Sequence, residues 1–208
     1  MVVLLFLLPV HNIILHERGT IWNLSYSRGV WLRFVAWKAC LILTNSNATK
    51  TMLEKKFYII SEKIRVLHNG INTSIICSKI KSEHKHSSLF RVGFIGRLDT
   101  PKGVHVLIDA AHHLVGNSIE LIIAGDGVLE NVLKSQADGL ENVSFIGRIG
   151  EPYNFLNSLD LLVVPSIREP FGNVCLEAGL CKTPVLAANV DGIPEIITDK
   201  VSGELITP

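Results

Sequence analysis

Two glutamates that lie eight positions apart, Glu169 and Glu177, have a side-chain type and a spacing that suggest chemistry. Glu169 and Glu177 enclose the stretch Glu-Pro-Phe-Gly-Asn-Val-Cys-Leu-Glu, which follows an apolar run typical of a buried strand. Pro170 and Gly172 predict a turn, and the apolar spacing after them predicts a helix. The N–H groups of its first turn would point outward beside Glu169, where they could bind an anion or sugar hydroxyls.

The spacing of these two carboxylates favours two separate contacts with one extended ligand over a touching acid pair. This stretch alone leaves an alternative open, because an acidic residue also stabilises the start of a helix. In that interpretation Glu169 caps the helix N-terminus and Glu177 is a solvated surface charge.

A pair of cations lies in another predicted loop, Gly96–Gly103, which follows a predicted strand and leads into a predicted helix. Lys102 comes five residues after Arg97. Both side chains and the helix N-terminus could therefore converge on phosphate oxygens. Lone Arg and Lys residues are more often surface charges, but the position directly after a strand favours binding here.

His16 and Arg18 follow the apolar run Ile13-Ile14-Leu15 near the beginning of the chain. This pattern predicts a strand that ends in a polar loop. Ligands of open α/β sheets bind at the carboxyl ends of strands, which makes both residues candidates. The alternative is a histidine that only forms structural hydrogen bonds.

The remaining motifs argue against several kinds of site. Gly125-Asp126-Gly127 half resembles a dinucleotide fingerprint, but Glu130 occupies the place of the third glycine, so we expect a tight turn and no nicotinamide or flavin site. The chain has neither an Asp-x-Asp pair nor a Gly-x-Ser-x-Gly elbow. No cysteine lies in a Cys-x-x-Cys pair or beside a His at metal-ligand spacing. We therefore expect no metal site, and we expect reduced, mostly packed thiols in a cytoplasmic protein. The cysteines are Cys40, Cys77, Cys175 and Cys181.

The distribution of polar and apolar residues predicts two domains of the α/β class. Residues 73–88 are polar and weakly patterned, so we interpret them as a linker between a partial N-terminal domain, residues 1–72, and a C-terminal domain, residues 89–208. In the second domain apolar strands alternate with helical segments, which implies a parallel, Rossmann-like sheet covered on both faces. The expected strands are residues 91–95, 119–124, 143–146, 161–164, 184–187 and 204–206. The expected helices lie near residues 103–115, 127–137, 151–158, 171–181 and 192–197.

The first 70 residues are basic, with nine Lys or Arg against three Asp or Glu, although the net charge of the chain is only +1. Within this part, Trp31, Phe34 and Trp37 lie at helical spacing between basic residues of the expected helix 28–39. Packing of this aromatic face against a sheet is the first explanation, and an interfacial membrane helix is the second. Apart from the basic balance, nothing in the sequence suggests a nucleic-acid partner.

Several motifs, taken in order, resemble those of GT-B glycosyltransferases of family 4, the "group 1" retaining enzymes. The resemblance covers nearly the whole chain, and the ordered set is more specific than any single motif. It implies the GT-B fold, with a Rossmann-like C-terminal domain that binds a nucleotide sugar and a partial Rossmann-like N-terminal domain on the acceptor side. The motifs are Asn69–Asn72, Gly96-Arg97-Leu98 with Lys102-Gly103, Ala124–Gly127, Asn142-Val143 with Gly147, Glu169 with Glu177, and Gly192–Glu195.

The resemblance implies roles for four catalytic residues. Arg97 and Lys102 match the pair that binds the donor's diphosphate and stabilises its departure without a metal ion. Glu169 matches the carboxylate that holds hydroxyls of the transferred sugar, and His16 matches a histidine that reaches the reacting sugar from the other domain. No protein nucleophile is implied, because the acceptor attacks on the face that the diphosphate leaves and passes its proton to the leaving phosphate.

The resemblance also implies the remaining contacts of the donor. Glu177 matches the carboxylate that binds the ribose, and the nucleobase would lie near Arg148 and Ile149. The backbone of three residues would lie beside the sugar. These residues are Phe171, Gly172 and Asn173.

The implied enzyme is a hexosyltransferase-type glycosyltransferase of surface polysaccharide or glycolipid assembly, in the cytoplasm or at the inner face of the membrane. Its partners would be a nucleotide-sugar donor and a glycan or lipid-linked acceptor, with no further cofactor. The pattern matches only from His16 onward and stops before the closing helices of the family, which implies truncation at both ends, and Asp191 stands where a first glycine is common. The alternatives are a non-catalytic nucleotide-sugar-binding remnant and a sugar-nucleotide epimerase of the same fold, which the carboxylate spacing and the two cations disfavour.

Overall fold

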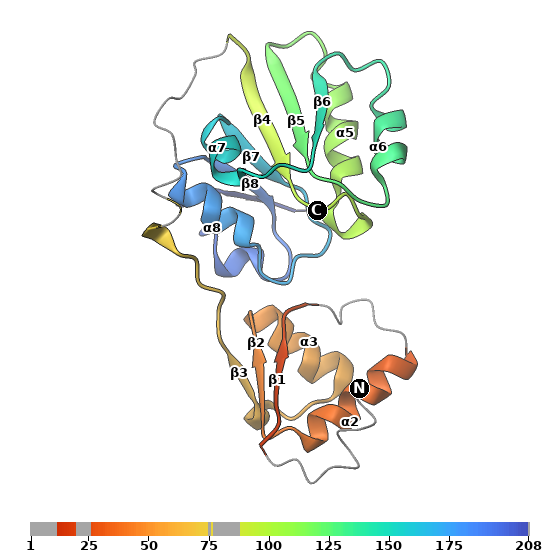
Figure 1. Cartoon of the computed structure of the whole chain (residues 1–208), viewed down its shortest axis with the longest axis vertical. Coiled ribbons are helices and arrows are strands. Elements are labelled where there is room, and N and C mark those ends of the chain that lie inside the picture. Colours follow the sequence, from red (N-terminus) through yellow and green to blue (C-terminus); the bar gives the residue numbers. More distant parts are fainter. Residues whose placement is uncertain (1–11, 20–25, 75, 77–87, 208) are drawn as a thin grey trace. The chain divides into compact units, whose positions relative to one another are not determined.

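The computed structural model describes residues 12–19, 26–74, 76 and 88–207, and it divides into two compact units, Met1–Asn69 and Gly70–Pro208 (Figure 1). The division falls three residues before the domain boundary that we expected. Most of the expected linker, residues 77–87, lies outside the described residues. Ile76, within the same stretch, is buried in the core of the second unit.

The first unit is a three-stranded parallel sheet in the order β1-β2-β3 with two described helices. Short apolar runs form its strands, and Ser46 begins α3 because its side-chain oxygen accepts a hydrogen bond from the N–H of Thr49 at 3.0 Å. β1 and α2 agree with the strand expected at residues 13–15 and the helix expected at residues 28–39. The elements are β1 (Ile14–Glu17), α2 (Tyr26–Lys38), β2 (Leu41–Thr44), α3 (Asn47–Phe57), a 3₁₀ turn (Ser61–Lys63) and β3 (Ile64–Val66).

The core of the first unit lies between its sheet and helices, and Ile42, Leu53 and Ile64 are fully buried in it. Helix α2 contributes Ala36 to this core, and Leu32 of the same helix packs against it. Its aromatic side chains do not follow the expectation of packing against a sheet, because Trp31 is 51% exposed and Trp37 is 68% exposed. The first explanation of the aromatic face is therefore wrong for these two residues.

The second unit is a six-stranded sheet in which every pairing is parallel, in the order β6-β5-β4-β7-β8-β9. This is the doubly wound order of a Rossmann-like fold, in which the chain reverses its direction of travel between the two central strands. All six expected strands are confirmed. The elements are β4 (Phe90–Ile95), a 3₁₀ turn (Thr100–Lys102), α5 (Val104–His112), β5 (Ile119–Ala124), α6 (Glu130–Gln136), β6 (Val143–Gly147), α7 (Pro152–Asn157), β7 (Leu161–Val164), α8 (Asn173–Leu180), β8 (Val185–Ala188), a 3₁₀ turn (Ile193–Glu195) and β9 (Glu204–Ile206).

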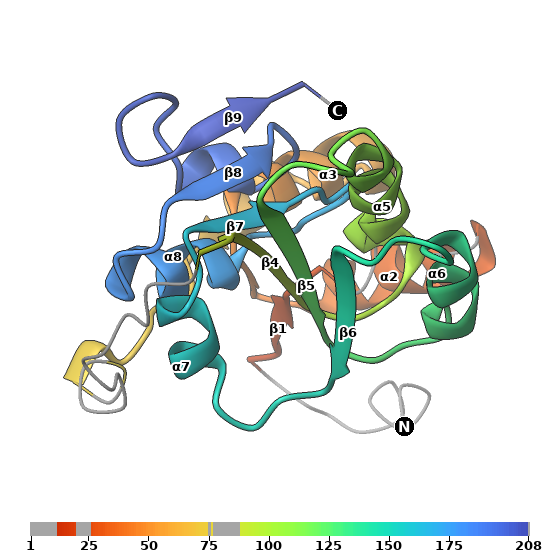
Figure 2. The same ribbon diagram turned by 90° about the horizontal axis from the view of Figure 1, so that it is seen from above.

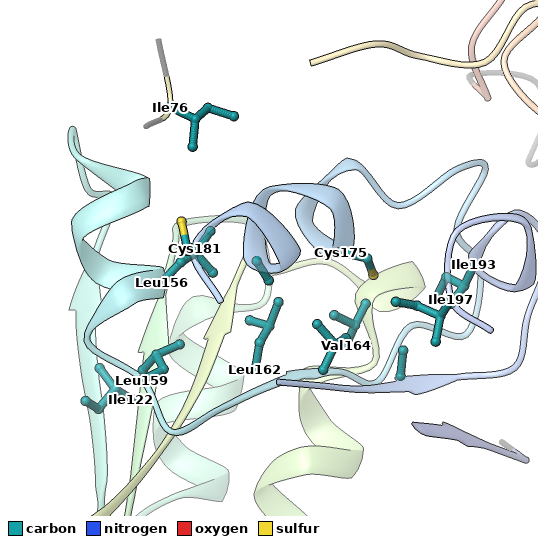
Figure 3. Close-up of a cluster of buried hydrophobic side chains, with 13 residues drawn as sticks. Ile76, Ile122, Leu156, Leu159, Leu162, Val164, Cys175, Cys181, Ile193 and Ile197 are labelled. Carbon is teal, nitrogen blue, oxygen red and sulfur yellow. The ribbon is translucent and has the colours of Figure 1, made fainter. Parts of the chain in front are cut away.

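Helices cover both faces of the second sheet, α5 and α6 on one side and α7 and α8 on the other (Figure 2). The pleat of β7 sends Leu162 and Val164 into the cluster beneath α7 and α8, while Val163 enters the cluster beneath α5. Figure 3 shows the first cluster, where Cys175 of α8 lies above the strand residue Val164. The continuous apolar strands follow from this burial on two faces.

Two further expectations are modified by the structure. The segment expected to be helical near residues 192–197 is only the 3₁₀ turn Ile193–Glu195, which contains a proline that has no N–H for a longer helix. Cys175 and Cys181 are packed as expected, whereas Cys40 is exposed. Cys77 lies outside the described residues.

Candidate functional site

The candidate residues of the second unit gather where β4 and β7 lie side by side. These central strands pair in parallel, so the loops that follow them leave the same edge of the sheet. The connections from β4 and β7 then run to opposite faces, which opens a crevice where ligands of such sheets bind. The loop after β4 carries Arg97 and Lys102, and the loop after β7 carries Glu169.

Lys102 and Glu169 form a direct ion pair in this crevice. The ammonium of Lys102 lies 2.6 Å from Oε2 of Glu169, and the exposed fractions of the two side chains are 23% and 9%. Ser166 donates a second, longer hydrogen bond to the same carboxylate oxygen at 3.3 Å. A buried carboxylate needs such partners, because its desolvation would otherwise be costly. Glu169 is therefore held inside the site.

The backbone brings the two loops together. Gly103 has a φ of +67°, and a Cβ at this position would lie 2.0 Å from the carbonyl oxygen of Pro165. From the other side, the carbonyl of Pro101 accepts hydrogen bonds from the N–H groups of Ile167 and Arg168, at 2.8 and 3.1 Å. Only a glycine fits at position 103, because any Cβ would collide with the Pro165 carbonyl oxygen. This close approach of the two loops places Lys102 beside the loop that carries Glu169.

Arg97 occupies a neighbouring part of the edge. It lines an open pocket of about 360 Å³, and its guanidinium is 3.2 Å from Oδ2 of Asp99. Arg97 is 77% exposed, so the guanidinium is accessible to a ligand. The pocket brings Arg97 together with Arg148 and Ile149, the residues near which the resemblance places the nucleobase. The lining residues are Ile95, Gly96, Arg97, Gly125, Asp126, Arg148 and Ile149.

The glycines after β5 form the tight turn that we expected. A Cβ on Gly125 would lie 1.8 Å from the carbonyl oxygen of Gly96, and one on Gly127 would lie 2.4 Å from that of Leu98. The N–H of Leu98 also donates to the carbonyl of Asp126 at 2.8 Å. The loops after β4 and β5 are therefore in backbone contact at the rim of the pocket.

Helix α8 carries the second carboxylate. Its N-cap position is held by Gly172 and not by Glu169, so the capping interpretation of Glu169 does not describe this helix start. Glu177 lies in the second turn, where burial raises the pKa of its carboxyl group. Burial, and next the charge of Glu177, also raises the pKa of the Tyr153 hydroxyl. Glu177 is accordingly a half-buried group beside Tyr153, and the alternative of a solvated surface charge is wrong.

Residues 171–173 form the start of α8 beside Glu169. A Cβ on Gly172 would lie 3.5 Å from Cγ of Glu169 and 3.7 Å from Sγ of Cys175, so these side chains surround the helix start. Burial, and next the Glu169 carboxylate, raises the pKa of the Cys175 thiol to about 12, although Lys102 opposes the shift. The thiol therefore stays protonated at neutral pH and is a poor nucleophile.

His16 belongs to the first unit. It lies on β1, where it is paired with Leu43 of β2, and its side chain is exposed. The next residue, Glu17, is buried and accepts a hydrogen bond from the N–H of Gly19 at 2.6 Å. The strand therefore ends in an ordered turn and presents His16 and the exposed Arg18 at its carboxyl end.

Sequence reasoning missed the residues that support Glu169 and Arg97. Ser166 and Asp99 contact the predicted residues directly, and Asp191 accepts a hydrogen bond from the N–H of Glu169 at 3.0 Å. The sequence signal for Ser166 and Asp99 was only that each lies within three residues of a predicted site residue. The signal for Asp191 was its departure from the family pattern. Within the described ranges there is no group of three or more His, Cys, Asp or Glu side chains that could hold a metal ion.

The fold and the crevice define a Rossmann-like domain of the nucleotide-binding type, and the comparisons with known proteins specify its family. Residues 78–208 match the family Glycosyl transferases group 1. An uncharacterized glycosyltransferase of Methanocaldococcus jannaschii, MJ1607, is 32% identical over 187 residues, which are 83% of this chain and 48% of that protein. The chain belongs to the group 1 glycosyl transferase family.

Two other similar proteins are a named transferase and a structure solved with a nucleotide sugar. The N-acetylgalactosamine-N,N'-diacetylbacillosaminyl-diphospho-undecaprenol 4-alpha-N-acetylgalactosaminyltransferase of Campylobacter jejuni is 30% identical, over 81% of this chain and 47% of that protein. The crystal structure of Anabaena HepE in complex with UDP-glucose has a TM-score of 0.85 and 28% identity, over 95% of this chain and 59% of that one. The chain spans about half the length of the curated relatives it matches.

Proposed function

We propose that the second unit binds a nucleotide-diphosphate sugar, and that the chain belongs to an enzyme that transfers this sugar to a glycan or lipid-linked acceptor. The observation that carries the proposal is the ion pair of Lys102 and Glu169, whose Nζ and Oε2 atoms lie 2.6 Å apart. The pair lies where the loops after the central strands β4 and β7 meet. A cation and a carboxylate in contact suit the two chemically different parts of such a donor. The similar HepE structures, which contain UDP or UDP-glucose, support this class of ligand.

The site divides into a phosphate side and a sugar side. Arg97, exposed above its pocket, and Lys102, at the ion pair, supply positive charge for the diphosphate, which is where charge develops when the bond to the sugar breaks. Two fixed cations can serve in place of a metal ion for this purpose. Glu169 would accept hydrogen bonds from sugar hydroxyls, with the backbone of residues 171–173 alongside.

The nucleoside would lie between the loop that follows β6 and the helix α8. Arg148 and Ile149 line the pocket that also contains Arg97, which suits a base adjacent to the diphosphate. Glu177 would hold the ribose hydroxyls. Its raised pKa indicates a carboxylate that has lost water contacts, and hydrogen bonds from a ribose would replace them.

The transfer would proceed with retention and without a covalent enzyme intermediate. The acceptor oxygen forms a bond to the anomeric carbon on the face from which the diphosphate departs, the bond to the phosphate oxygen breaks, and the acceptor proton moves to that oxygen. Cys175, the cysteine at the start of α8 beside Glu169, is buried with a pKa of about 12 and is unsuited to attack. His16 of the first unit would contact the reacting sugar.

Calorimetric titration with UDP and with GDP tests the donor site. We expect the wild-type chain to bind one of the two, and an Arg97→Ala, Lys102→Ala variant to lose at least about tenfold in affinity, since two charge-assisted contacts are removed. A Lys134→Ala, Lys200→Ala variant, which removes two cations outside the crevice, should bind like the wild type. Equal losses in both double variants, or no binding by a folded wild-type chain, would contradict the proposal.

We further propose that α2 makes a peripheral contact with an anionic membrane at the inner face. Trp31 and Trp37 are exposed, and Lys63 donates to the backbone carbonyl of Trp37 at 2.7 Å. Arg33 lies over the ring of Tyr58 at 5.7 Å and Lys38 over that of Trp37 at 5.6 Å, so cations surround the aromatic side chains. Aromatic residues with adjacent cations suit a lipid interface with anionic headgroups.

A spanning segment is not part of this proposal. None of the helices within the described residues combines the length and the apolar character needed to cross a bilayer. Co-sedimentation with lipid vesicles tests the peripheral contact.

A further inference from the structure

Asp191 contacts the backbone of Glu169. It precedes Gly192 and stands where the first of two glycines is common in the group 1 family. Its carboxylate oxygen Oδ2 accepts the N–H of Glu169 at 3.0 Å, and its side chain is only 9% exposed. Asp191 adopts a φ of +46°. Aspartate tolerates this left-handed conformation better than most residues, so the replacement of glycine keeps the local backbone and adds a carboxylate.

The neighbouring glycine completes the contact from the same loop. The N–H of Gly192 donates to the carbonyl of Glu169 at 3.0 Å. Gly192 is packed so tightly that a Cβ would lie 2.3 Å from the carbonyl oxygen of Pro170. Both peptide groups of Glu169 are thus held by the loop after β8, and one of the two hydrogen bonds depends on the Asp191 side chain.

The charge of Asp191 has a partner of its own. Oδ1 of Asp191 lies 3.3 Å from Nη1 of Arg168, whose side chain is 57% exposed. Arg168 therefore offsets a second negative charge placed close to Glu169. An asparagine could still accept the N–H of Glu169, but it would lose the ion pair with Arg168.

We propose that Asp191 is a positioning residue for the sugar half of the donor site. It holds the Glu169 backbone so that the carboxylate stays between Lys102 and the place of the sugar hydroxyls. A glycine would allow the same turn but would leave the Glu169 amide without this acceptor. The inference rests on the proposed role of Glu169 in sugar binding, and it assigns to Asp191 an effect on the sugar part of the ligand and not on the nucleotide.

Titration with UDP-glucose and UDP separates this role from a general effect on the fold. For Asp191→Gly we expect UDP-glucose to bind about tenfold more weakly and UDP to bind within about twofold of the wild type, because one hydrogen bond to the sugar-binding residue is lost. Asp191→Asn should retain most of the wild-type affinity for UDP-glucose. Asp199→Ala is the matched control, because Asp199 accepts the N–H of Leu205 at 2.8 Å away from the crevice.

Amide hydrogen exchange supplies a readout that needs no ligand. The N–H of Glu169 should exchange at least about tenfold faster in Asp191→Gly than in the wild type or in Asp191→Asn, while amides in the central strands keep their protection. Equal weakening of UDP and UDP-glucose, or an unchanged Glu169 exchange rate, would overturn the positioning role. A wild-type chain that binds none of UDP, GDP and UDP-glucose would instead overturn the proposed donor site. The exchange experiment would still test the positioning role, because it needs no ligand.

Discussion

The ammonium of Lys102 lies 2.6 Å from a carboxylate oxygen of Glu169, although 67 positions separate the two residues in the sequence. The contact joins the loops that follow the two central strands of the second sheet. It places a cation and an anion where the proposed donor has its phosphates and its sugar. Within the pair each charge compensates the other, which offsets part of the cost of burying the carboxylate.

The first prediction concerns the energy of this pair. Lys102→Met leaves a mostly buried carboxylate without its cation, so we expect a loss of about 2–4 kcal/mol in stability. Glu169→Gln should cost less, about 1 kcal/mol, because Lys102 is more exposed and can reach water. The double variant should be more stable than the sum of the two losses implies, by about 1–3 kcal/mol.

Native-state hydrogen exchange of amides in β4 and β7 measures these stabilities in the second unit. Tryptophan fluorescence would not, because the three tryptophans lie at positions 22, 31 and 37 in the first unit. Strictly additive losses in the double variant would mean that the contact contributes no coupling energy.

The second prediction concerns the close approach of the two loops. Gly103→Ala and Gly116→Ala both place a side chain at a positive φ, of +67° and +83°, which costs about 1–2 kcal/mol. Only the Cβ at position 103 meets another atom, the Pro165 carbonyl oxygen at 2.0 Å, whereas nothing lies within 4 Å at position 116. We expect a total loss above about 3 kcal/mol for Gly103→Ala alone.

Nucleotide titration of the same two variants gives the functional consequence. Gly103→Ala should weaken UDP binding because it moves Lys102 away from the β7 loop, and Gly116→Ala should not. Similar stability and affinity for the two variants would show that the loops can separate without cost.

The third prediction uses the raised pKa of Glu177. A carboxyl whose pKa is higher in the folded than in the unfolded state favours folding while it is protonated, and this contribution is lost as the pH rises through the folded-state pKa. Glu177→Gln should therefore stabilise the second unit at neutral pH, and the gain should shrink toward zero in acid. The variant should also bind UDP more weakly if Glu177 holds the ribose.

Hydrogen exchange from about pH 4 to about pH 8, a range that starts near the ordinary pKa of a carboxyl group, tests this sign. Glu204→Gln is the control, because Glu204 is exposed. A stabilisation that is the same at every pH would attribute the effect to something other than the ionisation of Glu177.

The strands of the second unit could be predicted from the sequence because each is a short apolar run, and the runs at residues 119–124, 161–164 and 204–206 match the structure at both ends. The loops with Lys102 and Glu169 could likewise be assigned to strand ends. Their contact could not be predicted from local pattern, since β4 neighbours β7 and not only β5, the next strand along the chain. Strand order is decided by tertiary packing and cannot be predicted from local periodicity.

The role of Asp191 and the exposure of the aromatic face of α2 could not be predicted from the sequence either. Asp191 was visible only as a departure from a glycine, and the hydrogen bond that gives it a role depends on a fold contact between residues 22 positions apart. The periodicity of α2 identified a face with Trp31 and Trp37 but did not tell whether another element covers it. Ala36 is the residue of α2 that lies in the core cluster, whereas Trp31 and Trp37 lie outside it with more than half of each side chain exposed.

The last prediction concerns that exposed face. Trp31→Ser, Trp37→Ser should reduce co-sedimentation with anionic vesicles severalfold, because two interfacial aromatic side chains are removed, and high salt should reduce binding of the wild type by screening the adjacent cations. Val128→Ser, Val201→Ser is the matched control, since these side chains are 89% and 81% exposed in the second unit. Vesicles of neutral lipid should bind less protein than anionic ones. If the wild type does not sediment with anionic vesicles, or if both double variants lose binding alike, the aromatic face of α2 is not a membrane contact.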